Sequence, residues 1–212
     1  MKKIIGIILS MVLVLGLCAC GSPSPTDVTK DFMEAVKSQN AETLKTVYPD
    51  GEIDLLKEAQ KKESTDAEKA DDALQKIYNE EMKDKLFDFD YEVSNEKIDG
   101  DKATVDVAIT TYDLGSAFTD FATEFLKQAF SMALSGSSEK EINDKAAEIL
   151  SAELSKMKKD YTGTATLSLS QKDGQWVMDK IDENNNFYNI ITGGMGEAAK
   201  KIENSFGGSE DQ

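Results

Sequence analysis

The sequence predicts an α+β domain in which N-terminal helices pack on an antiparallel sheet of two hairpins, with a helical-hairpin insertion between the hairpins. Two observations lead to this prediction. Apolar residues recur at helical spacing in the first part of the chain, and they alternate with polar residues in two later pairs of short segments. Between those pairs, at about 116–159, the helical spacing returns. The predicted single domain covers residues 27–206.

Residues 1–19 have the features of an export signal. Lys2 and Lys3 precede an apolar run that is shorter than the roughly 20 residues needed to span a bilayer. The segment that follows, Leu17-Cys18-Ala19-Cys20-Gly21, resembles the bacterial lipobox. This resemblance implies cleavage before Cys20 and diacylation of its sulfur. An ordinary signal peptide or an uncleaved helix is the alternative, but the Ala-x-Ala pattern of ordinary cleavage is absent from the segment.

A lipid on Cys20 would attach the protein to the cell membrane at its extracytoplasmic face. Two acyl chains on one cysteine are enough for stable attachment. Because Cys18 leaves with the signal, Cys20 would be the one mature cysteine, and no intrachain disulfide could form. We therefore expect residues 20–26 to form a lipidated tether, and the fold to depend on its apolar core.

The charge of the chain restricts its partners. It has 40 acidic residues against 24 basic ones, all of them lysine, with no histidine and a formal net charge of −16. Loss of Lys2 and Lys3 with the signal changes this to −18 (−16 − 2). Such a surface repels nucleic acid and anionic lipid, so we expect no nucleic-acid partner and no membrane contact except the anchor. The simplest interpretation is a solubilising surface; attraction of a cationic peptide or protein is the alternative.

The helical elements are predicted in order along the chain. A first helix runs from Asp27 to about Ser38, and Asn40 caps a second that ends at the Pro49-Asp50-Gly51 turn. Residues 52–62 are predicted to be helical. Thr65 and Glu68 have the spacing of a capping box that opens a longer helix toward Leu86.

The two hairpins are predicted from alternation and turn residues. Phe89, Tyr91 and Val93 alternate with polar residues, as do Val105 and Val107, and Asp99-Gly100 lies between the two runs. A second pair, Thr164 to Ser170 and Gln175 to Ile181, is separated by Lys172-Asp173-Gly174. After it come a short apolar patch, Phe187 to Ile191, a final amphipathic helix, and a tail at 207–212 that we expect to be disordered.

The insertion at 116–159 is predicted to be a pair of helices. Nine apolar residues from Phe118 to Leu134 keep helical spacing, Ser135-Gly136-Ser137 interrupts them, and Ser138 with Glu141 forms a second capping box. We favour packing of this apolar face on the second helix and on the sheet. The alternative is a lid or partner surface made by Phe118, Phe121, Phe125 and Phe130.

Two segments resemble the nuclear transport factor 2-like (cystatin-like) superfamily. Val28 to Tyr48, with its Asp31-Phe32-Met33-Glu34-Ala35-Val36 start, looks like the opening helices of small exported members. The hairpin from Thr164 to Ile181, with Trp176-Val177-Met178, looks like their late strands. The resemblance covers most of 27–192 and implies a curved sheet wrapped over a helix, forming a cone that can hold a small ligand. Members with a lipobox and a domain of unknown function are common in Gram-positive bacteria. The helical insertion departs from the minimal pattern.

The residue inventory argues against catalysis. Some members of the superfamily are dehydratases or isomerases, and many are catalytically silent. A chain without histidine lacks the usual general base near neutral pH, and it can form no Ser-His or Cys-His nucleophile. Asp106 and Asp113 are the carboxylates that could serve instead. We expect no enzyme activity and no cofactor.

Metal sites are not predicted either. Zinc would lack both histidine and a free cysteine. The segment 182–186 begins like a calcium loop, but Phe187 stands at the position of the required glycine and Gly193 at that of the bidentate glutamate. The pattern is that of a polar turn.

The sequence thus predicts a membrane-anchored, non-enzymatic binding or interaction module. Its ligand would be a small molecule or peptide in a cone lined by Tyr91, Tyr112 and Trp176, or an envelope protein at the helical insertion. Two alternatives stay open: an envelope accessory protein that works through protein contacts only, and a carboxylate-based dehydratase or isomerase. The three aromatic residues could equally belong to the core.

Overall fold

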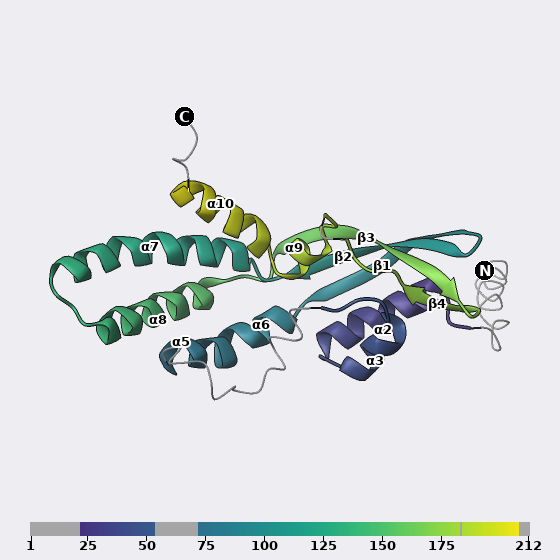
Figure 1. Cartoon of the computed structure of the whole chain (residues 1–212), viewed down its shortest axis with the longest axis horizontal. Coiled ribbons are helices and arrows are strands. Elements are labelled where there is room, and N and C mark those ends of the chain that lie inside the picture. The colour runs from purple at the N-terminus through teal and green to yellow at the C-terminus, as the bar shows by residue number, and fades with distance from the viewer. Residues whose placement is uncertain (1–21, 54–71, 183, 208–212) are drawn as a thin grey trace, which may run out of the picture.

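The structure is a computed structural model that describes residues 22–53, 72–182 and 184–207. Figure 1 shows an elongated molecule, with a four-stranded sheet at one end and two long helices extending from the other end of the sheet. The predicted lipobox with Cys20, most of the helix expected at 52–62, the start of the helix expected from Thr65, and the tail after Gly207 lie outside the described residues.

The sheet is antiparallel and has the order β1-β2-β3-β4. Both predicted hairpins are confirmed: β1 pairs with β2, and β3 pairs with β4. The turn between β3 and β4 has φ of 52° at Asp173 and 78° at Gly174, the conformation of a type I′ turn. The strands are β1 (Asp90–Asp99), β2 (Lys102–Thr111), β3 (Tyr161–Lys172) and β4 (Gln175–Met178).

The helices follow the predicted order, with two differences in the first half of the chain, and the segment Phe187–Ile191, predicted only as an apolar patch, is also a short helix. The first, α2 (Pro25–Lys37), begins two residues earlier than expected, because Ser24 is its N-cap and forms a capping box with Asp27. Pro25 is therefore the first helical residue, where its missing N–H costs nothing, and the tether before the helix is shorter than predicted. Asn40 caps α3 (Ala41–Val47) as predicted, accepting the N–H groups of Glu42 and Thr43.

The second difference is in the helix expected to end near Leu86. It consists of α5 (Asp72–Ile77), a π-helical turn η1 (Tyr78–Met82) and α6 (Lys83–Phe87). A π-helical turn widens a helix by one residue, and the apolar spacing of a sequence does not reveal it. The remaining helices are α7 (Leu114–Leu134), α8 (Glu139–Lys156), α9 (Phe187–Ile191) and α10 (Met195–Gly207).

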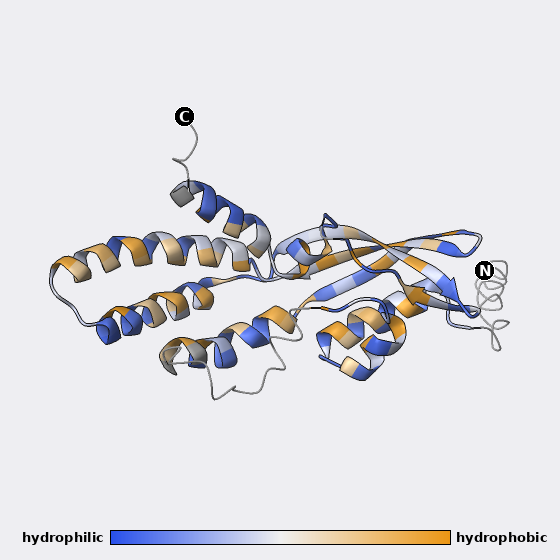
Figure 2. Cartoon of the chain, viewed as in Figure 1, coloured by the Kyte–Doolittle hydropathy of each residue, from blue (hydrophilic) through white to orange (hydrophobic). Residues whose placement is uncertain are grey.

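The core lies between the inner face of the sheet and the helices α2 and α9. Phe32 of α2 is fully buried, with its ring 5.3 Å from that of Tyr48 and 5.7 Å from that of Phe187. Val105, Val107 and other alternating residues of β2 and β3 face this layer, as their period of two predicts. In Figure 2 apolar residues recur along the strands and along α2.

Polar contacts protect the edges of the sheet. On β1 the register shifts between Ser94 and Lys97, and the strand carries several charges, both of which discourage pairing with another strand. Along the free part of β3, the chain after β4 takes the place of a strand: Asp179 N–H donates to the Ser168 carbonyl at 2.9 Å, and Asn185 Nδ2 donates to the Thr166 carbonyl at 2.9 Å.

Candidate functional site

The two long helices, α7 and α8, form an arm that joins β2 to β3. Asp113 caps α7 by accepting the N–H of Ser116 at 2.9 Å. At the far end the predicted capping box is confirmed, with Ser138 Oγ accepting the N–H of Glu141 and the Glu141 carboxylate accepting the N–H of Ser138 at 2.7 Å. The arm starts at Leu114, slightly earlier than the predicted 116, because Asp113 follows β2 so closely.

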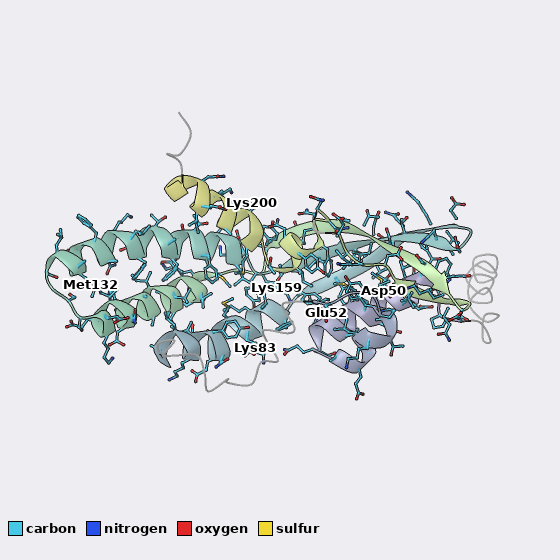
Figure 3. The ribbon with its side chains drawn as sticks, in the orientation of Figure 1. Asp50, Glu52, Lys83, Met132, Lys159 and Lys200 are labelled. Carbon is cyan, nitrogen blue, oxygen red and sulfur yellow. The ribbon has the colours of Figure 1, made fainter. Side chains whose placement is uncertain are left out.

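The arm points away from the N-terminal end of the described chain. Thr26 N–H donates to Glu96 Oε2 at 2.8 Å, near the turn between β1 and β2, so α2 begins at the end of the sheet that holds the hairpin turns. The arm leaves from the opposite end, where β2 ends and β3 begins (Figure 1). In Figure 3 Met132 marks its outer part and Lys159 its root.

The apolar face of α7 divides into a covered half and an uncovered half. Near the sheet, Phe118 and Phe121 pack against the core cluster, and the ring of Phe125 stacks on that of Phe121 at 5.7 Å. Farther out the face is open to solvent: the exposed fractions are 43% for Leu126, 71% for Phe130 and 75% for Leu134. We call Leu126, Phe130 and Leu134 the apolar row.

The apolar row corrects the interpretation that the sequence favoured. The whole face from Phe118 to Leu134 was expected to pack on α8 and the sheet, but only its inner part does so. The apolar arc of α7 is too wide for one neighbouring helix, since α8 covers one side and α10 contacts α7 on another. Of the four phenylalanines predicted as a lid or partner surface, Phe130 is exposed, Phe125 is half-buried, and Phe118 and Phe121 pack on the core. Leu126 and Leu134 were not singled out, because exposure depends on neighbours that spacing alone does not give.

The three aromatic residues predicted to line a ligand cone lie in separate places. Trp176 is buried in β4, near the hairpin turns. Tyr91 in β1 donates its hydroxyl to Glu34 Oε1 of α2 at 2.7 Å, and burial together with that carboxylate raises the pKa of its hydroxyl. Tyr112 follows β2 directly, at the same end of the sheet as Tyr91, which pairs with Ile109, and its ring lies 4.7 Å from Lys85 Nζ. Trp176 is thus a core residue, and Tyr91 and Tyr112 have separate contacts.

Tyr112 lines an acidic cleft of about 380 Å³ beside the root of the arm. Lys159 Nζ donates to Asp88 Oδ1 at 2.8 Å and to Asp90 Oδ2 at 2.9 Å, and the bond from Lys159 holds the pKa of Asp88 below its ordinary value. Burial lowers the pKa of Lys159, but the two carboxylates outweigh this effect and leave it raised. A carboxylate stabilised in its charged form is a poor general acid, so this cluster is an ion pair that holds the root of the arm to β1. The cleft is lined by Glu80, Glu81, Asp84, Lys85, Asp88, Tyr112 and Ser155.

This ion pair makes the stability of the protein depend on pH. Asp88 has a folded pKa below its unfolded value of about 3.9, so its contribution is present above that pH and is lost as pH falls through the folded pKa. Lys159 has a raised pKa, so its contribution is lost only as pH rises through a value above about 10.4. We expect Lys159→Met to melt at a lower temperature than the wild type at pH 7, with the gap shrinking toward pH 3. Thermal melts at both pH values measure this, and a gap of constant size would show that the loss does not come from the charge of Asp88.

The other carboxylates considered for chemistry have structural contacts. Asp106 is half-exposed and accepts hydrogen bonds from Thr166 at 2.7 Å and Asn95 at 3.0 Å, which lower its pKa. Asp113 is the cap of α7. Asp182 accepts the backbone N–H of Asn184 at 2.8 Å, as in an Asx turn. Within the described ranges, no group of three His, Cys, Asp or Glu residues is placed to hold a metal ion.

Comparisons with known proteins give one weak match. No protein-family model matches the chain, and a search of curated proteins finds no match. Among solved structures, the chain is similar to a candidate lipoprotein, ycdA, from Bacillus subtilis subsp. subtilis strain 168, with a TM-score of 0.36 and 20% sequence identity. The match covers 72% of this chain, and the chain spans 42% of the length of that protein.

The comparison leaves the family open. The resemblance to the nuclear transport factor 2-like superfamily stays a prediction, whereas the α+β class with its antiparallel sheet is shown by the structure itself. Anchoring of this chain rests on the Leu17–Gly21 motif. In the part of the chain that the structure describes, every helix is too short or too polar to cross a membrane.

Proposed function

We propose that this protein is a lipid-anchored extracytoplasmic interaction module, without catalytic activity, that binds a protein partner through the apolar row on α7. The observation that carries the proposal is the exposure of Phe130 and Leu134, at 71% and 75%, on one helix face. Soluble proteins seldom leave large apolar side chains grouped on a surface unless something contacts them. Exposed Leu126 extends the row toward the core.

The position of the row supports this proposal. The described chain enters the fold through α2, at the end of the sheet with the hairpin turns, and the arm extends from the opposite end (Figure 1). An arm built in this way holds its apolar row at a distance from the anchor. That arrangement suits contact with another envelope protein rather than with the lipid bilayer that holds the anchor.

Neighbouring helices support the arm. Its two helices contact each other, α10 contacts α7, and α5 contacts α8. Ser151 of α8 donates its hydroxyl to Glu81 of the π-helical turn at 2.9 Å, which joins the arm to that brace. Preorganisation of this kind reduces the entropy lost on binding.

Site-specific photocrosslinking in cells that make the protein tests the proposal. A photoreactive phenylalanine analogue in place of Phe130 is expected to give a discrete crosslinked protein, and Leu134→Ser in the same chain is expected to weaken that product about tenfold. The matched control carries the analogue in place of Ile98, which is 55% exposed at the opposite end of the molecule. Products from both positions that are equal in yield and identity would contradict the proposal.

Cys20→Ser, which removes the acylation site, is expected to release the protein from the membrane fraction.

A further inference from the structure

We infer that the end of the sheet with the two hairpin turns, at 99–102 and 172–175, is held facing the lipid bilayer, so that the arm stands away from it. We call this end the turn end. The inference rests on the anchoring of Cys20 in the proposed function, and it adds which surface of the fold lies next to the lipid. Three observations support it: the short segment before α2, the contact of α2 with the turn end, and the elongated shape of an acidic molecule.

The first observation is the length of the segment before α2. Cys20 precedes Ser24, the N-cap of α2, by four residues, which span at most about 14 Å even when fully extended. Pro23 and Pro25 restrict the residues before them to extended conformations, and Ser24 accordingly has φ of −70° and ψ of 163°. With the Cys20 side chain and its lipid linkage included, the start of α2 stays within roughly 20 Å of the bilayer surface.

The second observation is that the start of α2 is fixed to the turn end. Thr26 N–H donates to Glu96 Oε2 at 2.8 Å, and Glu96 lies close before the turn between β1 and β2. Ile98 pairs with Ala103, which belongs to the core, so both residues lie on the face of the sheet that packs against α2. Because α2 and this turn are joined, a tether that holds Ser24 near the bilayer holds the turn end there as well.

The third observation is the length of the molecule beyond the turn end. The ten residues of β2 span about 33 Å, and α7 rises about 24 Å from Leu114 to Phe130. Figure 1 shows the sheet and the arm following one another along the long axis of the molecule. A chain anchored at the turn end can therefore bring Phe130 to the bilayer only by lying flat.

The charge of the protein opposes that flat orientation. The chain carries a formal net charge of −16, and its acidic residues are spread along its length. Repulsion from anionic lipid acts within about 10 Å of the surface at moderate salt, so a flat molecule exposes far more of its charge to repulsion than an upright one. The turn end thus faces the bilayer because the tether keeps it there, and not because lipid attracts it.

Quenching by lipid headgroups tests the inference in the full acylated chain. A fluorophore is attached at Ile98→Cys or at Phe130→Cys; each introduced cysteine is the sole free thiol, since Cys18 leaves with the signal and Cys20 is acylated. The two positions are both exposed, at 55% and 71%, so access of a soluble quencher is comparable. In vesicles of phosphatidylcholine and phosphatidylglycerol with a nitroxide on the headgroup, quenching is expected to be at least about threefold stronger at position 98, because the tether limits its distance from the lipid.

A longer tether provides the matched control. Insertion of about twenty glycine and serine residues after Gly21 adds a flexible segment with an end-to-end distance of about 25 Å. Quenching at position 98 is then expected to fall to within about twofold of quenching at position 130. The insertion lies before α2 and leaves the described fold unchanged, so a loss of quenching reports on the tether and not on the stability of the sheet.

Two results would overturn the inference alone. Equal quenching at positions 98 and 130 of the acylated chain would show that the molecule has no fixed orientation or lies flat. Undiminished quenching at position 98 after the insertion would show that lipid itself attracts the turn end. An intact mass without acyl chains on Cys20 would instead overturn the anchoring in the proposed function, and the inference with it. The photocrosslink from position 130 measures the partner contact independently of all three results.

Discussion

Gly193→Ala is expected to destabilise the protein by about 3 kcal/mol or more. Gly193 has φ of +56°, and a Cβ at this position would lie 1.9 Å from the Tyr112 carbonyl oxygen and 2.9 Å from the Leu114 nitrogen. Both of these are backbone atoms at the junction of β2 and α7, so neither can move like the end of a flexible side chain. The same glycine accepts the N–H of Gly115 through its carbonyl. A shift of its backbone would therefore loosen α10 and the root of the arm together.

A second glycine with a positive φ separates the cost of the close contact at Gly193 from the cost of its backbone conformation. Gly136, in the loop between α7 and α8, also has a positive φ, +77°, but a Cβ there would meet nothing within 4 Å. Gly136→Ala should cost only the strain of the left-handed conformation, about 1 kcal/mol. Equilibrium unfolding in urea measures both variants. Equal losses would show that the approach to Tyr112 relaxes without cost.

Phe32→Ala is expected to lower the free energy of unfolding by about 3–5 kcal/mol, whereas Phe130→Ala changes it by less than about 0.5 kcal/mol. Both residues are phenylalanines within helices, so intrinsic helix propensity affects them equally. Phe32 is fully buried, and its removal leaves a cavity beside Tyr48 and Phe187. Phe130 is 71% exposed and loses little packing when it is truncated.

The same urea titration measures the Phe32→Ala and Phe130→Ala variants. The free energies of unfolding are compared through the urea concentrations at the midpoints, provided that the dependence of the free energy on urea concentration is unchanged. A loss of more than about 2 kcal/mol in Phe130→Ala would mean that the apolar row is covered within the protein, and the proposed interaction surface would lose its basis. A stable Phe130→Ala variant is also the form required for binding experiments, because a loss of partner contact could then not be attributed to unfolding.

Much of the fold was predictable because it depends on local signals. Ser138 and Glu141 form the capping box at the start of α8, and Asn40 caps α3. Asp173-Gly174 permits the tight turn between β3 and β4. Each of these acts through hydrogen bonds or backbone angles within a few residues, which the sequence displays directly. The π-helical turn at Tyr78–Met82 was missed because nothing in the spacing of apolar residues distinguishes it from an ordinary helix.

The candidate site was predicted less well because it depends on distant neighbours. Phe118 and Phe130 belong to the same periodic pattern, yet one packs on the core and the other is open to solvent. The difference arises because Phe118 lies near the start of α7, where the core cluster covers it, whereas Phe130 lies about three turns farther along the arm. The predicted grouping of the three aromatic residues was wrong for a similar reason: Trp176 joins the core layer and lies at the opposite end of the sheet from Tyr112.

The sequence by itself determined the α+β class, the two hairpins and the helical arm. These properties follow from residue types and their spacing. Only the tertiary structure decided which part of the α7 face is exposed, where Gly193 meets Tyr112, and which carboxylates pair with Lys159. The exposure of a side chain and the partner of a charge depend on segments that are many residues apart in the sequence. Contacts between such segments form only when the chain packs, so no local pattern reveals them.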